Sequence, residues 1–503
     1  MLMMSSSSPT LPTIRLDATL SELYGWASPR LADKKIAQLL CGISAAMPLS
    51  KDVPRNLKYL YHDASFTRPA LDDKSDAAKL RDAFISGDTS VLLFYIGSDK
   101  DQKAHDKAEA DRTMAVLDRT QQPELLFCPG PSELPIKDAN IDLVAYKIAL
   151  DDLDKYNLLI PAETHWFLNS KEALARSGLP TPRCTVIELD GFSSKADSCC
   201  DSCRESHDPI SIPLNCAGVR GMWLAEQSQK VYDVLSGYPV PFVLKNQQTF
   251  GGAGTYLIRT EDDRQALLDD FRGGVLSHLL ATVTEHNHHL SPGNLLFSDF
   301  VTEPIGDYGV TFFVADDEKE PMFLAASEQL TDDDNAWIGS TINYDRQEEL
   351  KRKFGPLIKK IAEWLQGYGY VGPCGADILE TASKADESNG ADGTGEEHWP
   401  NFHVVDLNVR TSGSLCLPLL GGHFTSRGLQ SASSFSISVR KDRDDFIALF
   451  PTEFEDGSMA ILSWYRDPRT GVSLADVAVG AKDARKLKEE MQRVRDSTDQ
   501  VTF

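Results

Sequence analysis

The sequence predicts an α/β protein of more than one domain, and three observations support this. The chain has 503 residues, 41% of them hydrophobic, and a single hydrophobic core stops growing well below this length. Short apolar runs bounded by turn residues, TSVLLFYIGS, PELLFCPG and YNLLIPA, are typical of buried parallel strands. Polar helical stretches such as DKAEADRTMAVLDRT separate these runs. We therefore expect residues 1–163 to form an α/β domain.

The charge and the apolar runs exclude several classes of function. The formal net charge is -24, with 75 acidic residues against 51 basic ones, so a general nucleic-acid-binding surface is not expected. The N-terminus lacks a charged segment before a long apolar run, and no stretch approaches the roughly 18 apolar residues of a membrane span. We expect a cytoplasmic protein with no membrane partner.

The middle of the chain begins with a helix and a strand. In NSKEALARSGLPTPRCTVIEL a helical segment stops at Gly178, and two prolines lead into a β-branched strand. After an irregular insertion rich in Ser, Cys, Asp and Pro, PVPFVLK begins another strand. We expect a second domain over residues 164–298.

The last third of the chain combines a clear helix with a pair of strands. PLIKKIAEWLQGYG has an apolar face and stops at Gly367. The strands GPCGADILET and NFHVVDLNVR follow, separated by a loop with almost no apolar content, and a charged helix ends the chain. We expect a third domain over residues 299–503.

The cysteines indicate reduced thiols rather than a disulfide framework. Nine cysteines in a chain this long are sparse and odd in number. Cys199, Cys200 and Cys203 do cluster, but a zinc site would need a second pair at similar spacing, and none is evident. A polar surface insertion is the favoured interpretation of this segment.

A glycine-rich stretch, VLKNQQTFGGAGTYLI, follows a strand that ends in Lys245. It is neither a Walker A loop nor a dinucleotide fingerprint, because G-K-[ST] and G-x-G-x-x-G are both absent. Its backbone N–H groups, with the lysine charge, suit phosphate oxygens. A glycine-rich hairpin without a ligand is the alternative. The loop residues are Gly251, Gly252, Ala253, Gly254 and Thr255.

A second cluster of polar residues lies downstream, in GADILE and VVDLNVR. Asp406, Asn408 and Arg410 stand at alternate positions and so share one face of a strand, which Asp377 joins if the two strands form a hairpin. Two carboxylates and an amide oxygen suit Mg²⁺, and Arg410 could hold a transferred phosphoryl group. A solvated outer sheet face is the alternative.

In this order, the lysine strand, the glycine loop and D…D-x-N-x-R resemble the ATP-grasp superfamily, over roughly Lys171 to Leu429. More loosely, the chain is similar to ATP-grasp proteins of fungal secondary metabolism. The resemblance implies an N-terminal pre-ATP-grasp domain and two lobes whose antiparallel sheets hold ATP between them. It makes Lys245 and the glycine loop phosphate contacts, Asp377, Asp406 and Asn408 the ligands of Mg²⁺ or Mn²⁺, and Arg410 the group near the acyl phosphate.

The resemblance also gives roles to the segment LFSDFVTEPIGDYGVTFFV as a hinge strand. Asp299, Phe300 and Val301 would frame the adenine and Asp307 would meet the ribose hydroxyls. Lys171 matches the second phosphate-binding lysine only loosely, because its spacing to Gly178 is short. Asp299 stands where Glu is commoner.

The implied activity is ATP-dependent ligation. A carboxylate, an amino acid or a related acid, would be activated as an acyl phosphate and joined to an amine, with release of ADP and phosphate. A kinase of the same fold and a nucleotide-binding module without turnover are the alternatives, and a homodimer is common for the fold. Substrate contacts are expected from Glu328, Trp337, Ser414, His423 and Arg427.

Overall fold

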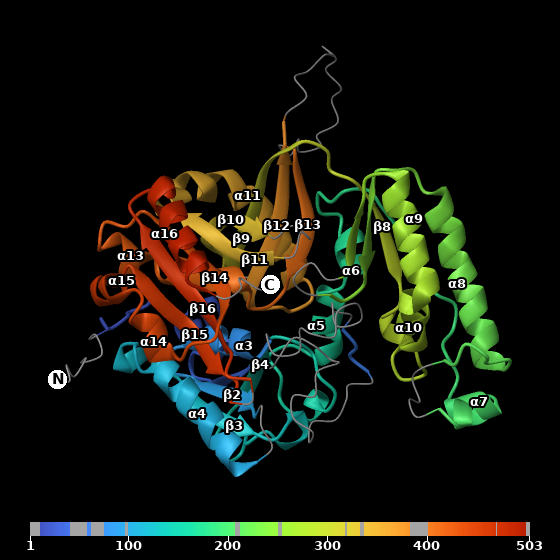
Figure 1. The fold of residues 1–503 in the computed structure, drawn as a ribbon, viewed down its shortest axis with the longest axis horizontal. Coiled ribbons are helices and arrows are strands. Elements are labelled where there is room, and N and C mark those ends of the chain that lie inside the picture. Colours follow the sequence, from blue (N-terminus) through green and yellow to red (C-terminus); the bar gives the residue numbers. More distant parts are fainter. Residues whose placement is uncertain are drawn as a thin grey trace, which may run out of the picture.

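The computed structural model describes residues 11–40, 58–61, 75–95, 99–206, 212–249, 254–316, 319–331, 337–382, 401–468 and 470–498. Its strands form three sheets, which Figure 1 shows as separate parts of the molecule. The predicted fold class is confirmed: a parallel sheet comes first in the chain, and two antiparallel sheets follow.

The N-terminal sheet is parallel and has the strand order β3-β2-β1-β4. Its strands are β1 (Ile36–Leu40), β2 (Ser90–Phe94), β3 (Glu124–Cys128) and β4 (Leu143–Tyr146). The helices of this part are α1 (Leu20–Ala27), α2 (Pro29–Ala32), α3 (Ser75–Phe84) and α4 (Lys100–Met114). Every residue of β1 and β2 is buried, as expected of strands covered on both faces. The run YNLLIPA forms no strand here. Leu158 makes only an isolated bridge to Val144, and α5 (Ala162–Leu168) begins at the last residue of the run.

The central lobe has an antiparallel sheet of its own, in the order β5-β8-β6-β7. Its elements are α6 (Lys171–Ala175), β5 (Cys184–Ile187), α7 (Asp201–Arg204), α8 (Val219–Gly237), β6 (Phe242–Asn246), β7 (Thr255–Ile258), α9 (Glu261–Asp270), α10 (Leu276–Ala281) and β8 (Leu295–Asp299). Figure 1 shows α8 beside α9, with α10 continuing below α9, along one side of this lobe. A separate core, with Leu235, Phe242 and Phe297 at its centre, holds these helices to the sheet.

The large sheet is antiparallel, in the order β13-β12-β9-β10-β11-β14-β16-β15. Its strands are β9 (Pro304–Val314), β10 (Met322–Thr331), β11 (Trp337–Asn343), β12 (Gly372–Thr381), β13 (Phe402–Asn408), β14 (Ser431–Val439), β15 (Met459–Arg466) and β16 (Ser473–Ala481). Its helices are α11 (Gln347–Gln366), α12 (Cys416–Leu419), α13 (Gly421–Thr425), α14 (Arg443–Ile447), α15 (Pro451–Asp456) and α16 (Ala484–Asp496). The apolar face predicted around Leu357 and Ile361 is buried, and α11 packs against β9 and β10.

The N-terminal sheet and the large sheet share a core, whereas the sheet of the central lobe has a core of its own. One cluster joins Leu39 and Leu92 of the N-terminal sheet to Phe312 and Ile361 of the large sheet and its helix. The segment expected to be one hinge strand is divided: β8 belongs to the central lobe and β9 to the large sheet, so the chain crosses between them over residues 300–303. None of the helices in the described part of the chain is long and apolar enough to cross a bilayer.

Candidate active site

A cavity of about 720 Å³ lies where the three parts of the molecule meet. The central lobe lines it with Lys245 and with residues of β7 and α9. The large sheet contributes residues of β9, β12 and β13, and the N-terminal part contributes Arg81 and Lys147. Cavities of this size at domain junctions are the usual place of small-molecule sites.

The predicted hairpin of β12 and β13 places two carboxylates opposite each other. Asp377 and Asp406 are direct partners in the antiparallel register, so their side chains leave the sheet on the same face. Asn408, two residues further on, joins that face. All three residues line the cavity. The strand ends at Asn408, and Arg410 lies just beyond it rather than within it.

Each of these three side chains already has a partner. Gln329 Nε2 donates to Asp377 Oδ1 at 2.6 Å. Lys171 Nζ donates to Asp406 Oδ1, and Arg410 Nη2 donates to Asn408 Oδ1 at 2.7 Å. These hydrogen bonds use one oxygen of each carboxylate, and the second oxygen remains for a ligand.

Two lysines of the central lobe reach across to β13. Lys245 Nζ donates to the backbone carbonyl of Val405 at 2.6 Å, and Lys171 forms the ion pair with Asp406. Lys171 is buried, with 7% of its side chain exposed, and the ion pair offsets the cost of burying its charge. Lys245 lines the cavity, whereas Lys171 is not among the described residues that do.

The two carboxylates differ in their electrostatic environment. Burial, together with the neighbouring charge of Asp406, raises the pKa of Asp377 to about 7. Burial acts in the same direction on Asp406, but Lys171 and Lys245 outweigh it and lower the pKa of that carboxyl. Burial lowers the pKa of Lys245. A divalent cation beside both carboxylates would relieve the repulsion that raises the pKa of Asp377.

Two buried cationic side chains that were not predicted from the sequence also line the cavity. Lys147 Nζ is 2.6 Å from Asp82 Oδ2, and Arg81 Nη1 is 3.1 Å from Asp476 Oδ1. Thr411 Oγ1 also donates to Asp82 Oδ2, at 2.9 Å. A signal for Lys147 was present, because it is a lone lysine inside the apolar run LVAYKIAL; Arg81 had none.

The glycine loop is only partly within the described residues. Gly251, Gly252 and Ala253 lie outside them. Gly254 has φ +66°, and a Cβ there would come within 2.7 Å of Asn246 and Thr249 side-chain atoms, so this position requires glycine. Thr255 pairs with Lys245 across the β6–β7 hairpin and lines the cavity.

The predicted adenine and ribose contacts lie around the crossing between the lobes. Asp299 ends β8, with its Oδ2 3.3 Å from Arg183 Nε, and Phe300 stacks under the guanidinium of Arg259. Among the described residues, Asp299, Phe300 and Val301 do not line the cavity, whereas Arg259 and, on β9, Asp307 do. Burial raises the pKa of Asp307.

The expected substrate contacts divide into two groups. Ser414 lines the cavity, and its hydroxyl is 2.7 Å from that of Ser340. Glu328 is exposed and does not line the cavity, whereas its neighbour Gln329 does. His423 and Arg427 bond elsewhere, to the carbonyls of Gly457 and Asp456. The side chain of Trp337 lies outside the described part of the structure.

Comparison with known proteins gives matches among solved structures only. No protein-family model matches the chain, and no curated protein does. An ADP complex of an N5-carboxyaminoimidazole ribonucleotide synthetase matches at 12% identity and a TM-score of 0.49, covering 98% of this chain and 100% of that one. The same enzyme from Thermus thermophilus matches at 12% identity and 0.46, with 93% and 99% covered.

A phosphoribosylamine-glycine ligase from Thermotoga maritima also matches, at 11% identity and a TM-score of 0.44, with 92% of this chain and 96% of that one covered. These are distant likenesses. The chemistry of the site has to be inferred from its own side chains.

Proposed function

We propose that the chain is an ATP-dependent, ADP-forming ligase of the ATP-grasp superfamily, which activates a small carboxylic acid and joins it to an amine. One observation supports this above all. Asp377 and Asp406 are cross-strand partners at a cavity that Lys245, from the central lobe, and Arg410 also line. Opposed carboxylates with cations around them suit a Mg²⁺-bound polyphosphate.

The residues present fit a magnesium ion. Asp377, Asp406 and the amide oxygen of Asn408 are hard oxygen donors on one face. Burial first, and then repulsion from Asp406, raises the pKa of Asp377, and a cation would offset both. When bound, the ion would offset charge on the β- and γ-phosphates. Asn408 would have to exchange its bond to Arg410 for the ion.

The central lobe would hold the triphosphate. Lys245 would leave the Val405 carbonyl for a phosphate oxygen, and the predicted glycine loop would lie over the phosphates. Lys171 would keep Asp406 ionised and oriented, since it is paired with that carboxylate. Asp307 lines the cavity from β9, and it would meet a ribose hydroxyl.

The N-terminal side of the cavity would hold the acid. Arg410, Lys147 and Arg81 give it a cationic wall, which favours an anionic substrate. A carboxylate oxygen would attack the γ-phosphorus of ATP, and ADP would leave. An amine would then attack the acyl carbon, phosphate would leave, and the amine would lose one proton. Arg410 would offset charge on the transferred phosphoryl group.

A hydroxamate assay tests the proposal directly. Purified protein, ATP and Mg²⁺ are mixed with a panel of amino acids and small carboxylic acids, with hydroxylamine as a surrogate amine, and ADP, phosphate and hydroxamate are measured. We expect one class of acid to give hydroxamate in step with phosphate. Asp406→Asn is expected to lose this activity.

The matched control is Glu380→Gln. Glu380 is on the same strand as Asp377 but pairs with Lys353 at 2.6 Å, outside the cavity lining, so this variant should keep the wild-type rate. A stable phosphorylated product formed without an amine would show a kinase instead. Tight ATP binding with no turnover across the panel would favour a binding module, and absence of ATP binding would overturn the assignment of the cavity.

A further inference from the structure

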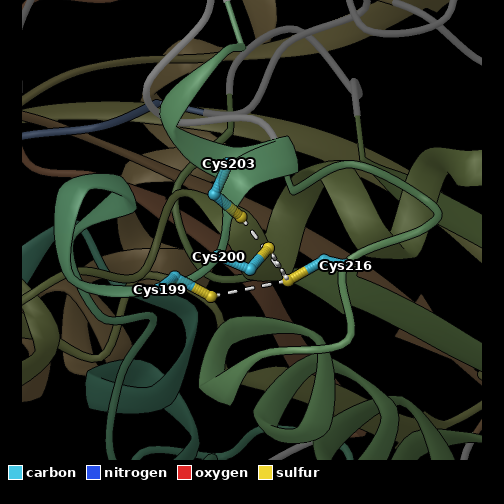
Figure 2. A group of neighbouring side chains, drawn as sticks. All are labelled: Cys199, Cys200, Cys203 and Cys216. Carbon is cyan, nitrogen blue, oxygen red and sulfur yellow. Dashed lines mark hydrogen bonds between the residues drawn. The ribbon is translucent and has the colours of Figure 1, made fainter.

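Four cysteine sulfurs meet in the central lobe, far from the cavity. Cys199, Cys200, Cys203 and Cys216 have their sulfur atoms within 4.8 Å of one another. Figure 2 shows the four side chains pointing toward one centre. Figure 1 places α7, which contains Cys203, at the end of the lobe remote from β12 and β13.

The spacing of the sulfurs fits one tetrahedral ion. Cys216 Sγ is 3.5 Å from that of Cys199, 3.7 Å from that of Cys200 and 3.4 Å from that of Cys203. Zinc binds thiolate at about 2.3 Å, and four such bonds in a tetrahedron set neighbouring sulfurs about 3.8 Å apart. We infer that these four cysteines form a structural Zn²⁺ site, a function separate from the proposed ligase chemistry.

The backbone around the cluster is shaped for these sulfurs. Cys200 and Cys203 have the C-x-x-C spacing of zinc ligands, and the fourth ligand, Cys216, lies just before α8 begins. A Cβ on Gly218 would come within 2.5 Å of Cys199 Sγ, and one on Gly221 within 2.0 Å of the Cys216 carbonyl oxygen. Glycine at both positions therefore lets the helix start approach the thiols.

A buried arginine complements the charge of such a site. Arg220 is 2% exposed. Its backbone N–H donates to the Cys199 sulfur and its side chain to the Cys203 sulfur, while its Nε donates to Ser193 Oγ at 3.1 Å. Four thiolates around Zn²⁺ leave two net negative charges, which hydrogen bonds and a neighbouring cation stabilise.

The segment needs a source of stability other than apolar packing. The core of the central lobe takes residues from α8, the sheet and the other helices, but none of its buried members comes from the described residues between Gly191 and Gly218. Small apolar-poor segments are commonly held by a metal. Zinc would fix α7 against the start of α8.

Other ways of using four cysteines fit less well. A pair of disulfides would bring the sulfurs together two by two at about 2.0 Å, whereas here Cys216 is nearly equidistant from the other three. An iron–sulfur cluster of several irons would hold the four cysteine sulfurs farther apart than the 4.8 Å within which these four lie. A single ion remains, and sulfur-only tetrahedra favour zinc.

Elemental analysis of the full chain tests the site without any variant. Protein purified under reducing conditions without chelators should contain about one zinc per chain and no stoichiometric iron. Four thiols should resist alkylation until a strong chelator removes the metal. Substitution by Co²⁺ should give the visible bands of a tetrahedral thiolate complex, with release of protons from the thiols.

Variants locate the ligands. Cys216→Ser should abolish stoichiometric zinc, while Cys184→Ser, a cysteine of the same lobe outside the cluster, should retain it. Zinc-free wild-type protein with four reactive thiols, or with mapped disulfides between these cysteines, would overturn the inference, as would iron in place of zinc. Unchanged zinc in a folded Cys216→Ser protein would overturn the assignment of that ligand.

Discussion

The carboxylate pair in the cavity and the cysteine cluster are both candidate metal sites, but their side chains are held in place in opposite ways. Asp377 and Asp406 are held in place by strand register within a sheet whose core is already complete. The four cysteines lie on short turns and irregular backbone that adds no buried residue to the lobe core. At the carboxylates, the sheet holds the ligands in place. At the cysteines, the bound ion would hold the irregular backbone in place.

The two sites also differ in their donor atoms, which are hard in the cavity and soft in the cysteine cluster. The cavity offers carboxylate and amide oxygens, which suit an ion that comes and goes with nucleotide phosphates. The cluster offers sulfur only, which suits a zinc ion that stays. We therefore expect metal loss to stop turnover at the first site and to destabilise the fold at the second.

The largest effect should come from the arginine of the cavity. Arg410→Met is expected to lower kcat by about 100- to 1000-fold, because it removes a cation aimed at developing phosphoryl charge. Arg427→Met is the matched control: its guanidinium donates to the carbonyls of Asp456 and His423, away from the cavity. Steady-state rates of ADP formation measure both variants, and equal losses would contradict the assignment of Arg410.

Selective removal of each metal should separate the two regions. Withdrawing Mg²⁺ should abolish turnover at once and reversibly, with little change in the thermal midpoint. A strong zinc chelator should lower that midpoint by several degrees, since a ligand that binds only the folded state stabilises it. Differential scanning calorimetry and rates on the same samples measure this. Loss of turnover before any zinc is released would show that the regions are not independent.

Strand periodicity explains why the centre of the cavity was predictable. Asp377, Asp406 and Asn408 were found from alternation and a hairpin, because residues two apart share a face and hairpin partners lie opposite each other. Glu328 was expected as a substrate contact without such a rule, and a sequence does not reveal which face of a strand meets a cavity. Its neighbour Gln329 is the one that reaches Asp377.

Contacts between distant segments were not predictable. Lys147 was visible as a lysine in an apolar run, but nothing local placed it at the same cavity as Asp406. Cys216 stands alone in the sequence, so the cysteine spacing indicated a surface insertion, and only the folded chain brings it to the other three sulfurs. Chain-distant partners depend on the whole topology, which short motifs do not encode.

Two glycine substitutions test whether the start of α8 packs closely against the cysteines. Gly218→Ala should weaken zinc retention by about 10- to 100-fold, the usual range for groups that support metal ligands, because its Cβ would meet Cys199 Sγ at 2.5 Å. Gly237→Ala, at the other end of the helix, has nothing within 4 Å of the added Cβ. Competition with a chromogenic chelator measures both, and equal affinities would contradict the close fit.

The smallest expected effect concerns the proton on Asp377. The pKa of this carboxyl is raised from 3.8 to about 7, so the folded chain binds more protons than the unfolded chain between these values. The stability it contributes is full below pH 3.8 and is lost as pH rises through about 7. In the absence of metal, the unfolding free energy should therefore fall by a few kcal/mol across this window, since one pKa unit corresponds to about 1.4 kcal/mol.

A divalent cation should reverse this dependence, because it competes with the same proton. Binding of Mn²⁺, followed by electron paramagnetic resonance, should tighten about tenfold between pH 6 and pH 8. Asp377→Asn removes the titrating group and keeps its shape, so the variant should bind weakly with little pH dependence. At the cysteine cluster, zinc should stay bound over the same range. A wild-type affinity for Mn²⁺ that is flat with pH would show that Asp377 is already ionised, and that Lys171 and Gln329 offset its burial more fully than the arrangement of charges around it indicates.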